Sequence, residues 1–144
     1  MDTALDTKFD SIASLPAIRA SAARRWAAGV LTGIPALFLA FDVALKFADP
    51  PMVAEATAKL GLPAGLSMGL GWVLAACLAL YLVRRTAPLG AMLLTGYLGG
   101  AVLTHLRVGD PWLSHTLFPI YVGALLWAGL YLRDDRVRRL LAAR

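Results

Sequence analysis

The sequence predicts an all-α membrane protein whose main domain is a bundle of four transmembrane helices. Four apolar segments of about 20 residues each follow one another, and a helix of that length crosses the hydrocarbon core of a bilayer. They run approximately from Trp26 to Phe47, Ala64 to Val83, Pro88 to Leu106 and Leu117 to Leu132. In addition, 59% of the 144 residues are hydrophobic, which is too apolar for a soluble domain of this size.

The length of the chain favours one domain with two small flanking segments. We place the transmembrane domain at residues 25–132, between a cytoplasmic or interfacial segment at residues 1–24 and a basic cytoplasmic tail at residues 133–144. The first segment has an amphipathic pattern at helical spacing, with Asp2, Asp6 and Asp10 on one face and Leu5, Phe9 and Ile12 on the other. A short amphipathic helix at the membrane surface is therefore expected.

The basic residues predict how the bundle is oriented, because lysines and arginines collect on the cytoplasmic side of a membrane protein. Eleven of the fourteen flank the first helix, form the second connection or follow the fourth helix: Lys8, Arg19, Arg24, Arg25, Arg84, Arg85, Arg133, Arg136, Arg138, Arg139 and Arg144. Both termini are thus expected in the cytoplasm. The net charge of +5 then reflects topology, and we expect no nucleic-acid partner.

Aromatic and proline residues refine this arrangement. Trp26, Tyr81 and Tyr131 are expected at the cytoplasmic interface, and Trp112 at the outer one. Pro35 and Pro119 lie within apolar segments and are expected to kink or loosen their helices. In the outer loop, Pro50 and Pro51 precede Glu55 and Lys59, which predicts a short surface helix that ends at Gly61.

Small residues recur at four-residue spacing on three of the helices, which allows close approach of helix backbones in lipid. They are Gly29 and Gly33, then Gly65 and Gly69, then Gly96, Gly100 and Thr104. Packing within the chain is one interpretation, and a homodimer interface is the other.

Asp42 and Lys46 lie one turn apart near the outer end of the first helix. A charge at the depth of Asp42 is costly unless it is paired or faces a wet cavity. Two interpretations therefore stay open: an ion pair that only supports the structure, and a pair that lines a binding cavity.

Four further polar residues converge on the same outer end: His105, Arg107, Asp110 and His115. The two histidines are ten residues apart with no second ligand pair, so we expect no metal site. Hydrogen bonding or proton exchange by the histidines suits their chemistry better, with loop anchoring as the alternative. Together with Asp42 and Lys46, these residues form the candidate ligand-binding site, and no catalytic residue can be assigned.

The segments Gly96–Pro111 (GYLGGAVLTHLRVGDP), Ser114–Tyr121 (SHTLFPIY) and Leu39–Phe47 (LAFDVALKF) resemble the DoxX-like family of small bacterial integral membrane proteins. The resemblance implies a compact four-helix bundle in the bacterial inner membrane. It also implies roles linked to quinone-dependent oxidation and to oxidant resistance, although the family shares no catalytic motif. The positions that match the family pattern are Asp42, Lys46, His105 and Arg107.

The leading functional hypothesis is that the bundle binds an apolar small molecule, with a quinone as the specific candidate, in a redox-linked process. The chain shows no redox group of its own, so any electron donor would come from a partner, and independent enzyme activity is not expected. The first alternative is an accessory or assembly factor for another membrane protein. A proton or solute conduit is less consistent with polar groups gathered at one end.

Overall fold

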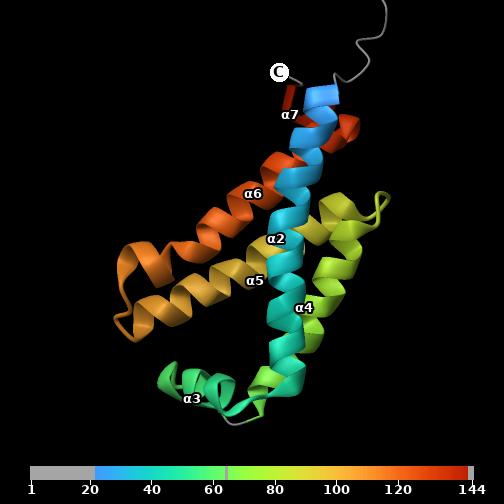
Figure 1. Cartoon of the computed structure of the whole chain (residues 1–144). Helices are drawn as coiled ribbons and strands as arrows, with labels where there is room; N and C mark the ends of the chain where they lie inside the picture. Colours follow the sequence, from blue (N-terminus) through green and yellow to red (C-terminus); the bar gives the residue numbers. More distant parts are fainter. Residues whose placement is uncertain (1–21, 64, 143–144) are drawn as a thin grey trace, which may run out of the picture.

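The computed structural model describes residues 22–63 and 65–142, which form helices joined by turns, with no strand among them. The long helices are α2 (Ala22–Ala48), α4 (Leu66–Leu82), α5 (Ala87–Arg107) and α6 (Phe118–Arg133) (Figure 1). The short ones are α3 (Pro51–Lys59), α7 (Asp135–Ala142) and a π-helical turn, η1 (Trp112–Thr116). The amphipathic helix expected near the N-terminus lies outside the described residues.

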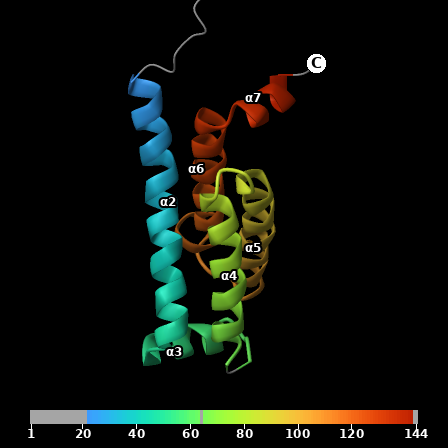
Figure 2. The same ribbon diagram turned by 90° about the vertical axis from the view of Figure 1, so that its right-hand side faces the viewer.

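The four long helices pack in a closed ring, in which α2 contacts α4 and α6, and α5 contacts the same two helices. Figures 1 and 2 show α3 at one end of this ring and α7 at the other. We call them the α3 end (residues 42–63, 65–67 and 104–119) and the α7 end (residues 22–33, 81–87 and 130–142). The prediction of an all-helical bundle is confirmed.

Leucines from every long helix form the centre of the bundle. Leu39, Leu74, Leu94, Leu126 and Leu130 are each no more than 2% exposed. Lipid tails are as apolar as leucine, so burial from water adds little inside a membrane. Close packing of these side chains holds the helices together by dispersion forces instead.

Tyr81 lies in the last turn of α4 and is part of this core, so its side chain faces the neighbouring helices, and its predicted position at the depth of the membrane interface stays a prediction. Its side chain is fully buried, and its hydroxyl donates a 2.8 Å hydrogen bond to the carbonyl of Leu126. The Arg133 guanidinium lies 4.5 Å from the ring centroid and donates to the Tyr81 carbonyl at 2.7 Å. A buried phenol needs such a partner, and the long-range contact with α6 cannot be read from the sequence around Tyr81.

The glycines at close helix contacts are not those of the predicted stripes. A Cβ atom at Gly90 would lie 2.2 Å from the Tyr81 nitrogen, and one at Gly129 would lie 2.6 Å from Thr32 Oγ1. In contrast, a Cβ atom on any stripe glycine would meet no atom within 4 Å: Gly29, Gly33, Gly65, Gly69, Gly96 and Gly100. The expectation of intramolecular packing through these stripes is therefore wrong, and a homodimer contact through them stays a prediction.

The bundle has the dimensions and surface of a membrane protein. By length and hydropathy, three described helical segments can cross a membrane: Ala22–Ala48, Ala87–Arg107 and Trp112–Arg133. The apolar α4 has 17 residues, about 26 Å of helix, so a fourth crossing stays a prediction. Large apolar side chains such as Leu37 (73% exposed) cover the outside, as expected for a surface in contact with lipid.

The short helix predicted in the first loop is confirmed as α3. Its end is a Schellman motif, in which the Leu62 N–H donates to Thr57 O and the Gly61 N–H to Ala58 O. Gly61 adopts the positive φ of 67° that this motif requires. In contrast, Pro119 does not interrupt a helix as expected, because it lies in the first turn of α6, where its missing N–H is harmless.

The basic tail contains a helix, α7, that was not predicted from the sequence. Asp134 separates α6 from α7 and caps α7, since its Oδ1 accepts a 2.9 Å hydrogen bond from the Arg136 N–H. Hydrogen bonds from the Arg136 guanidinium, aided by its charge, lower the pKa of Asp134 to about 2. Val137 of α7 is buried, whereas Leu140 and Leu141 are exposed.

Labelling of introduced cysteines tests the predicted orientation. Ala56 in α3 and Ala142 in α7 are both exposed and lie at opposite ends of the bundle. In a Cys77→Ala background, an impermeant thiol reagent added to intact cells should label Ala56→Cys and not Ala142→Cys. The reverse pattern would show that the bundle is inverted and that the α3 end faces the cytoplasm.

Candidate functional site

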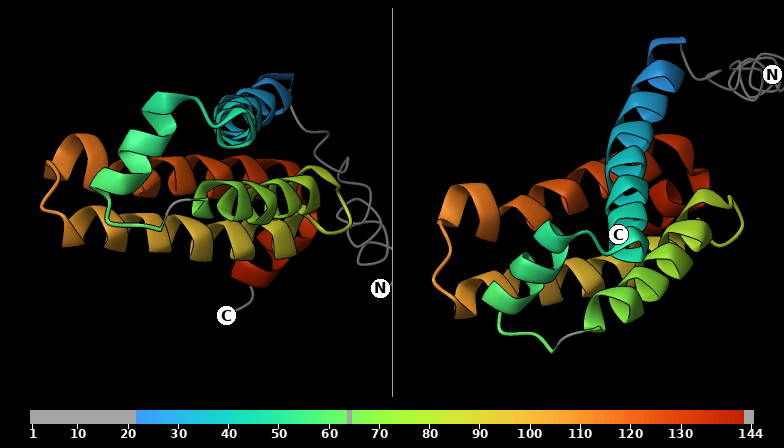
Figure 3. Two further views of the ribbon diagram at one scale, coloured as in Figure 1. Left: turned by 90° about the horizontal axis from the view of Figure 1, so that it is seen from below. Right: turned by 60° about the horizontal axis from the view of Figure 1, so that its bottom comes forward.

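A cavity of about 460 Å³ lies at the α3 end of the bundle. Its walls come from α2, the first turns of α4 and α6, and the C-terminal half of α5. α3, which crosses that end of the bundle (Figure 3), contributes Thr57 and the residues that follow the helix. The volume is within the range of known small-molecule sites. The apolar lining includes Phe38, Leu39, Leu60, Leu62, Leu66, Leu70, Leu98, Phe118, Pro119 and Val122, and the polar lining is Asp42, Lys46, Thr57, Ser67, Tyr97, Thr104 and His105.

Asp42 and Lys46 form an ion pair on the α2 wall of this cavity. The distance from Lys46 Nζ to Asp42 Oδ1 is 2.7 Å, and both side chains are partly buried. The i, i+4 spacing on one helix brings the two charges together without help from tertiary structure. The pair therefore presents an ammonium donor and a carboxylate acceptor to anything in the cavity.

His105 lines the cavity from α5 and is held by Asp110, five residues later. Nδ1 of His105 lies 2.7 Å from Asp110 Oδ2, and Lys59 Nζ of α3 lies 3.6 Å from Asp110 Oδ1. Because an ionised carboxylate only accepts hydrogen bonds, we assign the hydrogen to Nδ1. Asp110 thus orients the imidazole from outside the cavity and leaves Nε2 for contact with a bound molecule.

Arg107, a predicted residue of the site, does not line the cavity but fastens α3 to the end of α5. Its Nη2 donates a 2.5 Å hydrogen bond to the carbonyl of Leu60, the residue that ends α3. The N–H groups of the Schellman motif donate to the carbonyls of Ala58 and Thr57 and not to that of Leu60. The Leu60 carbonyl can therefore accept a hydrogen bond from a side chain of another helix. With the Lys59–Asp110 pair, this contact fixes α3 across the end of the cavity.

The structure therefore brings three of the six predicted residues into one cavity: Asp42, Lys46 and His105. Asp110 does not line the cavity but accepts the hydrogen bond that orients His105. His115 lies nearby, with its ring centroid 6.0 Å from that of His105, but it is exposed and contacts Ser114 Oγ at 2.8 Å. Neither Arg107 nor His115 lines the cavity.

Two further polar residues of the lining were not predicted. Ser67 is 4% exposed, and its buried hydroxyl has no hydrogen-bond partner within the described part of the chain. A buried hydroxyl without a partner is costly, so it is a ready donor or acceptor for a ligand. Tyr97 lies eight residues before His105, on the same face of α5, and helical periodicity could have revealed it.

Metal chemistry receives no support from the described residues. They contain no group of three or more histidine, cysteine, aspartate or glutamate side chains placed to hold an ion. The site instead combines mainly apolar walls with a few hydrogen-bonding groups, one of them an imidazole.

Acidification is expected to weaken the Asp110 contact. The hydrogen bond with His105 lowers the pKa of Asp110, and the charge of Lys59 lowers it further. Such a carboxyl contributes stability above its unfolded-state pKa of about 4 and loses it as the pH falls through the lower folded-state value. The melting temperatures of wild type and Asp110→Asn should thus converge between about pH 5 and pH 2. A difference that stays constant over this range would contradict the assignment.

The fold and cavity define a class: a small helical membrane protein with a partly open, mainly apolar site near one end of the bundle. Within this class, a model of the DoxX-like family matches residues 30–129, which is most of the chain and all of the cavity lining. The protein therefore belongs to the DoxX-like family, as its sequence motifs indicate. No curated protein and no solved structure matches the chain significantly.

Proposed function

We propose that the cavity at the α3 end binds an apolar small molecule through a hydrogen-bonding head group, and that this molecule is a quinone. The observation that carries the proposal is the composition of the lining: one mainly apolar cavity is lined by Asp42, Lys46, His105 and Ser67, whose hydroxyl has no partner within the described residues. Quinone carbonyl oxygens accept hydrogen bonds, which Lys46 Nζ and Ser67 Oγ can donate. The imidazole of His105 can also exchange a proton with such an oxygen.

Access to the cavity also suits a molecule dissolved in the bilayer. Phe38 of α2 and Phe118 of α6 both line the cavity, and each is more than 40% exposed on the outside of the bundle. Their rings pack edge to face with centroids 5.1 Å apart. Two aromatic rings between the cavity and the lipid would admit an apolar tail while the head group reaches the polar residues.

In this proposal the protein is a multi-pass component of the bacterial inner membrane, with the α3 end facing outward. It binds the quinone within a redox-linked process, and electrons come from a partner protein or its cofactor. The chain then acts as a binding subunit and has no independent activity.

Extraction of the native ligand tests this proposal. The full chain would be isolated from bacterial membranes in copolymer nanodiscs, without detergent, and its organic extract analysed by mass spectrometry. Quinone is expected in stoichiometric amounts. Gly100→Leu should remove it, because Gly100 lines the cavity and has space around it. Gly99→Leu is the matched control, since Gly99 has equal space but does not line the cavity.

A different result would refute the proposal. If wild type and both variants retain quinone equally, the molecule is part of the surrounding lipid. If the extract contains no quinone and another membrane protein is purified with the chain, the accessory or assembly role is favoured.

A further inference from the structure

A second hollow, of about 510 Å³, lies at the opposite, α7 end of the bundle. We call it the arginine groove, because Arg24, Arg25, Arg84, Arg133 and Arg138 line it. They come from α2, the α4–α5 turn, the last turn of α6 and α7, so only the folded chain brings them together. The single acidic side chain in the lining is Asp135, which pairs with Arg138.

Positive charge dominates this end of the described chain, which has eight arginines in residues 22–33, 81–87 and 130–142 and two carboxylates, Asp134 and Asp135. The backbone holds several of the arginines in place. Arg133 donates to the Tyr81 carbonyl, and Arg138 donates to the Leu132 carbonyl at 2.8 Å. Hydrogen bonds to carbonyls position a guanidinium without neutralising its charge, although Asp135 offsets the charge of Arg138.

The groove also has room for a ligand on its α2 side. Gly29 and Gly33 line it, and a Cβ atom at either position would meet nothing within 4 Å. Any larger residue would project into the groove. The open glycine face of α2, which makes no close helix contact, thus forms one wall of a hollow.

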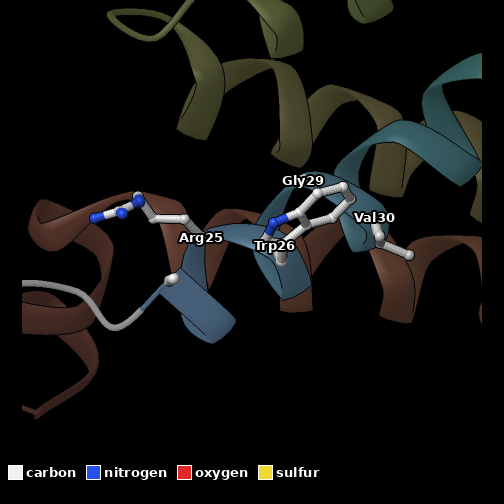
Figure 4. Close-up of a pocket in the computed structure, with 5 residues that line it drawn as sticks. Arg25, Trp26, Gly29 and Val30 are labelled. Atoms are coloured by element: carbon white, nitrogen blue, oxygen red, sulfur yellow. The ribbon is translucent and has the colours of Figure 1, made fainter.

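The residues around the groove are those expected at the level of the lipid head groups. Arg25 and Gly29 also line a shallower hollow beside Trp26, whose indole extends from the first turns of α2 (Figure 4). Trp26 is 76% exposed, as is typical of tryptophans at the level of lipid head groups. Ala28 and Leu132 add apolar surface to the groove itself. Four of the five arginines lie outside the residues that match the family model.

We infer that the arginine groove binds the phosphate of an anionic phospholipid, with the acyl chains along the exposed face of α2. Guanidinium groups bind phosphate oxygens through paired, charge-assisted hydrogen bonds. A soluble phosphate would satisfy the arginines alone, whereas a lipid also explains the apolar part of the groove and the adjacent indole.

Native mass spectrometry of the full chain in detergent tests this inference, with phosphatidylglycerol and phosphatidylcholine as probes. Phosphatidylglycerol is expected to bind at least about tenfold more tightly, given the strength of arginine–lipid attraction. Arg25→Gln with Arg84→Gln should remove this preference. Arg85→Gln with Arg139→Gln should retain it, because this control removes two charges from the same end outside the groove.

A second pair of variants separates the groove from general surface charge. Gly29→Leu with Gly33→Leu fills the groove and keeps every charge, so it should also lose the preference. Gly69→Leu with Gly99→Leu places the same bulk at open positions elsewhere and should not. Equal loss in the control and groove variants would overturn the inference. So would displacement of phosphatidylglycerol by excess inorganic phosphate, which would identify a soluble anion as the ligand.

Discussion

Asp42→Asn is expected to give a correctly inserted bundle of nearly unchanged stability that retains much less of its native small molecule. The Asp42–Lys46 pair is partly buried and lies on one helix, so its loss should cost about 1 kcal/mol or less of folding free energy. A hydrogen bond between Lys46 and a ligand depends on the carboxylate that positions it. Charge-assisted hydrogen bonds contribute enough that ligand retention should fall roughly tenfold or more.

His105→Ala should lower ligand retention in the same way, and the double variant should lose less than the sum of the two effects. The reason is that Asp42, through Lys46, and His105 act on one head group. His115→Ala is the matched control, because His115 lies close to His105 and does not line the cavity. Ligand retention and melting temperature would both be measured. A large loss of stability in Asp42→Asn, with normal ligand retention in the folded fraction, would favour the purely structural ion pair.

Gly90→Ala is expected to destabilise the bundle more than other glycine-to-alanine changes in α5. The added Cβ atom would lie within 2.2–2.7 Å of backbone atoms of Leu80 and Tyr81, which cannot move away as a side chain would. The clash would push α4 and α5 apart beside the buried Tyr81. Overpacking of a core typically costs about 1–3 kcal/mol, and the rigid contact here places Gly90→Ala at the upper part of that range.

Gly99→Ala is the control for this prediction, because Gly99 lies on the same helix with open space around it. There, alanine should stabilise the helix by roughly 0.5–1 kcal/mol. Thermal unfolding in detergent would compare the two variants. A Gly90→Ala protein as stable as wild type would show that α4 and α5 lie farther apart than described.

Local sequence patterns predicted those features that local interactions determine. Hydropathy located the helices to within a few residues, and the i, i+4 spacing of Asp42 and Lys46 was sufficient to predict their pairing. The short helix before Gly61 followed from its proline, glycine and charge pattern. In each case the deciding interactions lie within one helical turn or within one segment.

Contacts between distant segments could not be predicted in this way. Arg107 donates a hydrogen bond to Leu60, 47 residues away. Its position two residues after His105 had suggested that it would belong to the binding site. Ser67 became a candidate only when α4 was seen beside α2 and α5. The glycines at close contacts, Gly90 and Gly129, lie outside the repeated stripes because the crossing points of helices depend on their relative tilt.

Photolabelling with an azidoquinone tests most directly whether the α3-end cavity is a quinone site. The full chain in nanodiscs would be irradiated with the probe, with and without excess unlabelled quinone, and the labelled peptides mapped. We expect labels in residues 38–46 and 96–105, suppressed by the competitor. Labels spread over lipid-facing residues such as Trp72 and Met92, and unaffected by competitor, would contradict the proposed function.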